Sequence, residues 1–155
     1  MRPRTSPSRA AVAIGAALLL IGLTTGSALG RESAIITIEI DFEGAETFTT
    51  DSPLLCPSGE AFTDFEFGAG NFGAAGSFHL TKLLVCDDGS GTFAIRIDAA
   101  TNFVVGDGTV GGWSVVRGSG TDDYVGLKGG GSLVGVNTHT QPVDLVDFYF
   151  GSVRL

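Results

Sequence analysis

The sequence predicts an all-β protein, a single antiparallel β-barrel of about eight strands that follows an N-terminal export signal. Apolar and polar residues alternate in several short segments, which is typical of strands with one buried face, and the breaks between these segments carry Gly or Pro. Glycine makes up 20 of the 125 residues after position 30, about twice its usual ~7%. Because glycine costs about 1 kcal/mol at each helical position, this content disfavours a helical fold.

The first thirty residues have the three parts of a secretory signal peptide. Residues 1–9 are basic, residues 10–23 are apolar and uncharged, and residues 24–30 are small or polar, which predicts cleavage after Ala28 or after Gly30. An uncleaved membrane anchor is less favoured, because the apolar run has 14 residues and a spanning helix needs about 20. We therefore expect a signal peptide over residues 1–30, one domain over residues 31–155, and a secreted protein with no membrane attachment after cleavage.

The predicted mature part is acidic. Six Lys and Arg stand against 17 Asp and Glu after residue 30, a net charge of −11. Nucleic acids and anionic membranes are bound through basic surfaces, so neither is expected as a partner. A chain of 125 residues suits one domain that buries roughly two-thirds of its unfolded surface and needs no metal to fold.

Two cysteines, Cys56 and Cys86, both lie in the predicted mature part. In an oxidising compartment an even pair predicts a disulfide. A catalytic or metal-binding thiol is the alternative. It lacks support because the cysteines do not form a CxxC pair and the two histidines, His79 and His139, are not at ligand spacing.

The alternation and the turn residues together locate the strands. The first is the clearest, since Ile36, Ile38 and Ile40 share one face while Thr37 and Glu39 occupy the other. The turn Asp-Asp-Gly-Ser-Gly over residues 87–91 predicts a hairpin, and the glycine-rich residues 68–76 predict a loop. Strands are expected over residues 34–43, 46–51, 61–67, 77–86, 92–99, 102–105, 112–117, 123–127, 132–137 and 143–155.

An immunoglobulin-like β-sandwich is the alternative architecture. In that fold a disulfide joins the two sheets and packs against a Trp that lies between the cysteines in the sequence. The single Trp of this chain, Trp113, follows both cysteines, and the barrel is therefore preferred.

Residues 111–135, GGWSVVRGSGTDDYVGLKGGGSLVG, carry a family likeness. Trp113, Tyr124 and the surrounding glycines resemble the Trp…GTG-x-Tyr-x-Gly-Leu-x-Gly-x-Gly hairpin of small secreted bacterial proteins. Those proteins are grouped with the allene oxide cyclase barrel-like proteins, distant relatives of plant dirigent proteins. The segments 56–59 and 86–93 are similar to the two cysteine-bearing segments of the same group, so the likeness spans about residues 33–155. Asp122 departs from the pattern, which usually has Gly there.

The resemblance implies a closed antiparallel barrel whose interior is either filled by side chains or holds one small ligand. Plant relatives include a cyclase that acts on a fatty-acid epoxide and proteins that steer the coupling of phenolic radicals. None of their active residues can be transferred to this chain, because no matching motif occurs beyond the structural hairpin.

Five residues are candidates for contact with a ligand. Trp113 and Tyr124 offer large apolar area with one polar end each. Lys82 has the parity of Leu80 and Leu84 and could point inward, although a strand end or bulge that turns it to solvent is favoured. The last two candidates, Asp147 and Tyr149, share the parity of Val143 and Leu145, while Val146, Phe148 and Phe150 have the other; the sequence leaves open which face is inside.

No metal or cofactor is expected. The GxGxxG matches at residues 68–73 and 106–111 are not followed by the helix that a dinucleotide site needs. Calcium at the acidic turns 87–88 or 122–123 is a weaker alternative to solvated turn carboxylates. Nothing in the sequence combines a nucleophile, a base and an orienting group.

Three functions fit these observations. Non-catalytic binding of a small apolar or aromatic molecule inside the barrel is preferred. A structural or interaction protein at the cell surface with a filled barrel core is the alternative, and it predicts an exposed apolar patch or self-association. An isomerase- or cyclase-type enzyme is the second alternative, and it predicts inward carboxylate, lysine or tyrosine groups with perturbed pKa values. The sequence does not fix the oligomeric state.

Overall fold

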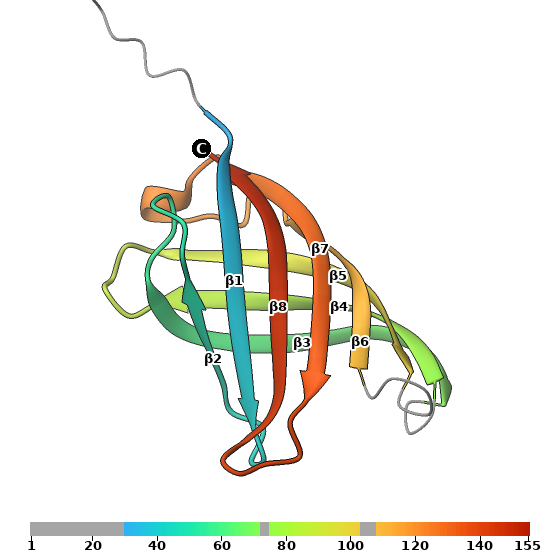
Figure 1. Cartoon of the computed structure of the whole chain (residues 1–155). Helices are drawn as coiled ribbons and strands as arrows, with labels where there is room; N and C mark the ends of the chain where they lie inside the picture. Colours follow the sequence, from blue (N-terminus) through green and yellow to red (C-terminus); the bar gives the residue numbers. More distant parts are fainter. Residues whose placement is uncertain (1–29, 72–74, 103–107) are drawn as a thin grey trace, which may run out of the picture.

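The computed structural model describes residues 30–71, 75–102 and 108–155, in which eight strands close into one antiparallel barrel (Figure 1). The predicted signal peptide lies outside the described residues except for Gly30, as do residues 72–74 of the predicted loop and residues 103–105 of one predicted strand. The strands are β1 (Glu32–Asp41), β2 (Glu46–Thr50), β3 (Ser58–Asn71), β4 (Ala75–Cys86), β5 (Thr92–Asn102), β6 (Gly108–Val115), β7 (Lys128–Asn137) and β8 (Val143–Arg154).

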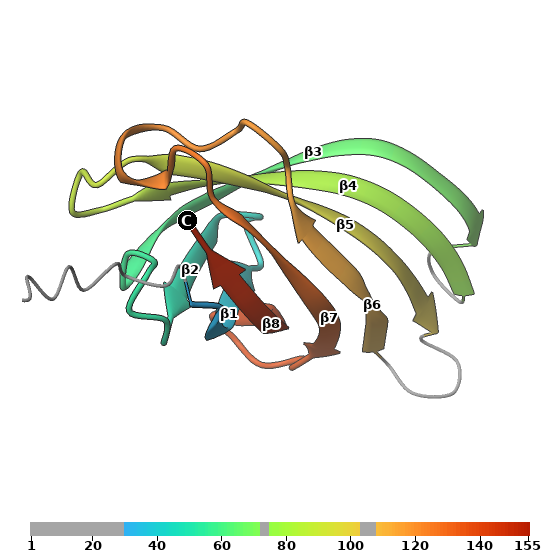
Figure 2. The same ribbon diagram turned by 90° about the horizontal axis from the view of Figure 1, so that it is seen from above.

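Each strand pairs with its neighbours in the sequence, and β8 pairs with β1 to close the wall. At one end of the barrel, which we call the disulfide end because Cys56 and Cys86 are joined there, the start of β1 lies beside the end of β8 and the chain terminates (Figures 1 and 2). At the opposite hairpin end, β1 turns into β2 and β7 connects to β8 (Figure 1). The predicted barrel is thus confirmed, and the sandwich alternative is excluded because one closed sheet replaces two packed ones.

Alternate residues of every strand fill the barrel, as the period-two pattern predicts. Ile36 and Ile38 of β1 and Phe93, Ile95 and Ile97 of β5 are all 1% exposed or less. The intervening residues of these strands face solvent or the outer wall. Among the described residues, no helix is long and apolar enough to cross a membrane.

The predicted disulfide between Cys56 and Cys86 is confirmed, with the two Cα atoms 5.9 Å apart. It joins the segment before β3 to the last residue of β4 at the disulfide end of the barrel. The aromatic rings of Phe93 and Tyr124 pack against each other there, with centroids 5.1 Å apart. This end of the interior is therefore filled by a cross-link and packed rings.

Two predicted segments differ from the structure. The expected loop over residues 68–76 is shorter, because β3 continues to Asn71 and β4 begins at Ala75. Pairing between these two strands overrides the local glycine content. The expected strand over residues 123–127 is wrong. A 3-10 turn, η1 (Asp122–Tyr124), begins at Asp122 with a φ of 49°, and it turns the Tyr124 ring into the core.

Candidate functional site in the barrel interior

The interior is not completely filled. A cavity of about 150 Å³ lies between the packed disulfide end and the hairpin end. Its apolar wall consists of Ile40, Phe78, Leu80, Ile97, Leu133 and Leu145. Its polar wall consists of Glu46, Thr63, Lys82, Thr109, Asp147 and Tyr149.

Lys82 faces this cavity from the middle of β4 and is 2% exposed. The favoured expectation that a bulge or strand end turns it to solvent is wrong, because the irregularity in the β3–β4 ladder falls elsewhere, between Phe65 and Phe67. The Lys82 ammonium donates hydrogen bonds of 2.6 Å to Glu46 Oε2 and of 2.6 Å to Thr63 Oγ1. Paired in this way, the buried charge is compensated, and this is what makes its inward position possible.

Asp147 and Tyr149 lie on the inner face of β8, which settles the parity that the sequence leaves open. Tyr149 is fully buried, Asp147 is 6% exposed, and the phenol of Tyr149 donates a hydrogen bond of 3.1 Å to Asp147 Oδ2. The other carboxylate oxygen, Asp147 Oδ1, is buried and has no hydrogen-bond partner among the described residues. An unpaired buried polar atom costs roughly 1–3 kcal/mol, so a further hydrogen-bond partner at this oxygen would stabilise the protein.

The environment of Asp147 favours its neutral form. Burial raises the pKa of Asp147 above 3.8, although the positive charge of Lys82 and the hydrogen bond from Tyr149 act in the opposite direction. Burial and the neighbouring Asp147 carboxylate raise the pKa of Tyr149 well above 10.0. Oδ2 accepts the hydrogen bond from Tyr149, so Oδ1 is the carboxyl oxygen left for a further hydrogen bond.

Gly135 makes room for this carboxyl group. It pairs with Asp147 across the β7–β8 ladder and is buried. A Cβ atom at position 135 would overlap Asp147 Oδ1 and would lie 3.1 Å from the Cβ of Thr109. The absence of a side chain at this position therefore leaves the space that the unpaired oxygen occupies.

The remaining two candidates lie elsewhere. Trp113 does not line the cavity but supports it: its ring meets that of Tyr149 edge-on, with centroids 6.3 Å apart, and its indole N–H donates to the carbonyl of Phe150 at 3.2 Å. Tyr124 belongs to the disulfide end. The structure thus brings together Lys82, Asp147 and Tyr149 but not all five candidates.

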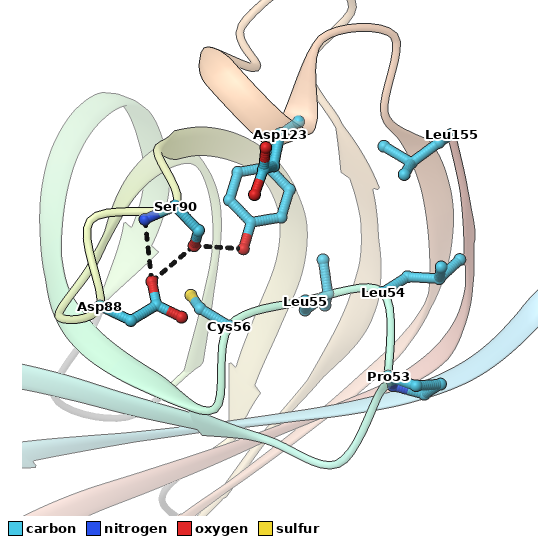
Figure 3. A pocket seen from close by; sticks show the side chains of 9 residues that line it. Pro53, Leu54, Leu55, Cys56, Asp88, Ser90, Asp123 and Leu155 are labelled. Atoms are coloured by element: carbon cyan, nitrogen blue, oxygen red, sulfur yellow. Dashed lines mark hydrogen bonds between the residues drawn. The ribbon is translucent and has the colours of Figure 1, made fainter.

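An open pocket of about 420 Å³ lies at the outer surface of the disulfide end (Figure 3). Its wall is made of Pro53, Leu54, Leu55, Cys56, Asp88, Ser90, Asp123, Tyr124 and Leu155. Three of its polar side chains are joined, because Ser90 Oγ bonds to Asp88 at 2.6 Å and to the Tyr124 hydroxyl at 2.8 Å. The hydrogen bonds that the Ser90 side chain and backbone donate to Asp88 lower the pKa of Asp88. No cluster of three or more metal-ligating side chains occurs in the part of the chain that is described.

The cavity also has a side wall that is thinner than the rest. The β2–β3 ladder ends where Glu46 meets Ala61, whereas β3 continues for ten more residues, to Asn71. Glu46 and Thr63 line both the cavity and an outer groove of about 480 Å³ beside β2 and β3. Beyond the end of the β2–β3 ladder, a side-chain hydrogen bond of 2.6 Å from Thr63 Oγ1 to Glu46 Oε1 joins β3 to β2 where backbone pairing has stopped.

Glu46, Thr63 and Thr109 are site residues that the sequence analysis missed. Parity was available for Glu46, which shares the face of the buried Phe48, but not for Thr109, because the expected strand begins at residue 112 whereas β6 begins at Gly108. Comparisons with protein families, with curated proteins and with solved structures find no match to this chain. By its geometry, the site is a small cavity with one apolar and one polar wall, one compensated ion pair and one carboxyl oxygen available for a hydrogen bond.

Proposed function

We propose that the protein binds a small apolar or aromatic molecule inside the barrel, without transforming it. The observation that carries this proposal is the unpartnered Asp147 Oδ1 beside a cavity of about 150 Å³. An apolar protein cavity of about this volume holds one benzene ring. The chemistry of Asp147 adds that the ligand should carry one oxygen atom able to accept or exchange a hydrogen bond, as in a phenol or a cyclic ketone.

Export to an oxidising compartment is part of the proposal. The charge pattern of residues 1–30 supports a signal peptide, and the Cys56–Cys86 disulfide is consistent with an extracytoplasmic location. The resemblance of residues 111–135 to the allene oxide cyclase barrel-like proteins supports the same assignment, since an eight-stranded barrel of that kind can hold one small ligand.

The test compares three probes of one ring each: phenol, cyclohexanone and benzene. Titration followed by amide chemical shifts should give phenol and cyclohexanone a dissociation constant of about 1 mM or lower, equivalent to about −4 kcal/mol, and benzene a weaker one. The shifts should map to β7 and β8 around Asp147. Asp147→Leu should remove the preference for the oxygen-bearing rings and leave benzene binding intact.

The controls keep this test interpretable. Asp64→Leu, a change of the same type at an exposed carboxylate of β3, should retain the preference, and Asp147→Asn should retain most of it because an amide can still form one hydrogen bond toward the ligand. If none of the three rings binds, the proposal is refuted and the filled-core alternative is favoured. If all three bind equally to the unmodified protein, the role given to Asp147 is refuted.

Proton transfer on a bound carbonyl compound is a second candidate function. The observation that favours it is a buried carboxyl group with a raised pKa, directed toward a cavity and held by Tyr149. An ionised Asp147 would take a proton from the carbon beside the carbonyl, and the resulting enolate would recover one. Exchange of that hydrogen of cyclohexanone in D₂O tests the idea; no acceleration over buffer, or acceleration that survives Asp147→Asn, would exclude it.

A further inference from the structure

The outer surface of the barrel carries an apolar face that no element of the described chain covers. It is formed by neighbouring outward residues of β6, β7, β8 and β1, and we call it the β6–β1 face. Its members are Ile35, Val110, Val134, Val136, Phe148 and Phe150. All of them except the half-buried Phe148 are 38% exposed or more.

The strand registers place these side chains in one continuous patch. Val134 is the centre, because it pairs with Val110 on β6 and with Phe148 on β8. Phe150 in turn pairs with Ile35 on β1, and the rings of Phe148 and Phe150 stack with their centroids 6.2 Å apart. The patch thus crosses four adjacent strands without interruption.

No charged residue lies within this patch. The outward positions that adjoin it on its own strands are Thr37, Gly108, Gly112, Ser132, Val146 and Ser152, none of them charged. The nearest charges lie at its edge: Asp51 accepts a hydrogen bond from the Ile35 N–H, and Glu39 lies opposite Val146. The contrast is notable in a chain with 17 acidic residues. Strongly acidic surfaces repel one another, so two copies of this chain can approach closely through a face that has no charge.

We propose that the β6–β1 face binds the same face of a second copy of this chain, related by a twofold axis. Sheet faces of this type pack about 10 Å apart with interdigitated side chains. The face and its uncharged neighbours take up about six residues on each of four strands, roughly 400 Å² of flat area, and projecting side chains add accessible surface to it. An area of that size is suited to the apolar centre of a standard interface of ~800 Å² per partner, of which only a little more than half is apolar and the rim is polar.

A second copy of this chain explains the uncharged β6–β1 face better than a basic protein or an anionic membrane does. A basic partner would be drawn to the acidic parts of the surface rather than to this neutral face, and an anionic membrane would be repelled. In a twofold pair each copy supplies both the aromatic residues and the aliphatic surface that covers them. This inference is independent of the ligand proposal, because the residues of the face point away from the cavity.

Sedimentation equilibrium of the exported protein tests the proposal. Dimer formation is expected with a dissociation constant in the micromolar range. Val134→Lys should weaken it about 100-fold, because the charge enters the contact from both copies. The matched control is Phe62→Lys: Phe62 is 52% exposed but lies on β3, outside the face, and its variant should dimerise normally.

Each result decides the question. A monomer at about 500 µM protein, equivalent to less than about 5 kcal/mol of association, would overturn the proposal. Loss of the dimer in the Phe62 variant but not in the Val134 variant would do the same. Circular dichroism checks that the variants fold; if Val134→Lys does not, amide hydrogen exchange of the unmodified protein should slow in β7 and β8 as its concentration rises. A protein that stays monomeric and binds phosphatidylcholine vesicles would assign the face to lipid instead.

Discussion

The buried ion pair between Lys82 and Glu46 can be tested by a double-mutant cycle. Lys82→Met and Glu46→Met each remove one charge while keeping most of the side-chain volume. Either change leaves the other charge buried without its partner, since the two side chains are 3% and 11% exposed. The double variant Lys82→Met/Glu46→Met removes both charges at once.

The expected magnitudes follow from this burial. Removing one partner of a buried pair costs about 3–5 kcal/mol, whereas replacing both by apolar residues is often neutral. Glu46 retains some access to water, so we expect about 3 kcal/mol for each single variant. The double variant should cost about 3 kcal/mol or less instead of about 6 kcal/mol, a coupling energy of about 3 kcal/mol.

Urea unfolding followed by the fluorescence of Trp113 is a suitable assay, because this chain has one Trp and it is 4% exposed. Arg96→Met is the control: Arg96 lies 3.8 Å from Asp98 in an exposed pair, and its loss should cost less than about 1 kcal/mol. The reasoning is refuted if Lys82→Met costs no more than Arg96→Met, or if the two single changes add. Either result would mean that Lys82 is solvated.

Three further results are expected. The unfolding free energy should fall as pH rises through the raised pKa of Asp147, because the native state holds that proton more tightly than the unfolded chain; a difference from Asp147→Asn that does not vary with pH would contradict this. Gly135→Ala should cost about 1–3 kcal/mol by crowding Asp147, whereas Gly112→Ala, whose Cβ would meet nothing nearer than 3.5 Å, should be neutral in the same unfolding assay. Replacing Cys56 and Cys86 by Ala should cost about 3.6 kcal/mol, the loop-closure value for 30 residues, and a loss below about 1 kcal/mol in reversible unfolding would show that the unfolded chain gains little freedom.

The strand pattern was largely predictable because period-two alternation reports one buried face directly. Prediction failed where contacts outside the segment itself decide the outcome. Residues 68–71 look like a flexible loop in isolation, yet β4 holds them in a ladder. Residues 123–127 look extended, yet burial of the Tyr124 ring is achieved by a 3-10 turn. The composition of each segment alone predicts neither the β3–β4 pairing nor the burial of Tyr124.

The site was predictable only in part for a related reason. Parity places Lys82 on the inner face, but a lysine costs too much to bury alone, so the sequence favours a solvent-facing side chain. Its partner Glu46 lies 36 residues away, and only the closed barrel brings the two together. Asp147 and Tyr149 could be paired from their spacing, but the face they occupy depends on the register between β8 and β1. Inward polar groups in a barrel are therefore found by topology rather than by local pattern.

The cavity and the outer face share a strand, which makes their independence testable. Tyr149 of β8 lines the cavity, while Phe148 and Phe150 on either side of it belong to the β6–β1 face. If ligand binding and self-association are coupled, thermodynamic reciprocity requires that each shifts the other by the same factor. Because the side chains lie on opposite sides of a stiff, paired strand, we expect no coupling. The dissociation constant for phenol should therefore be the same in monomeric Val134→Lys as in the dimer, measured by the same amide-shift titration, and a difference of more than about threefold would show that β8 transmits occupancy through the wall.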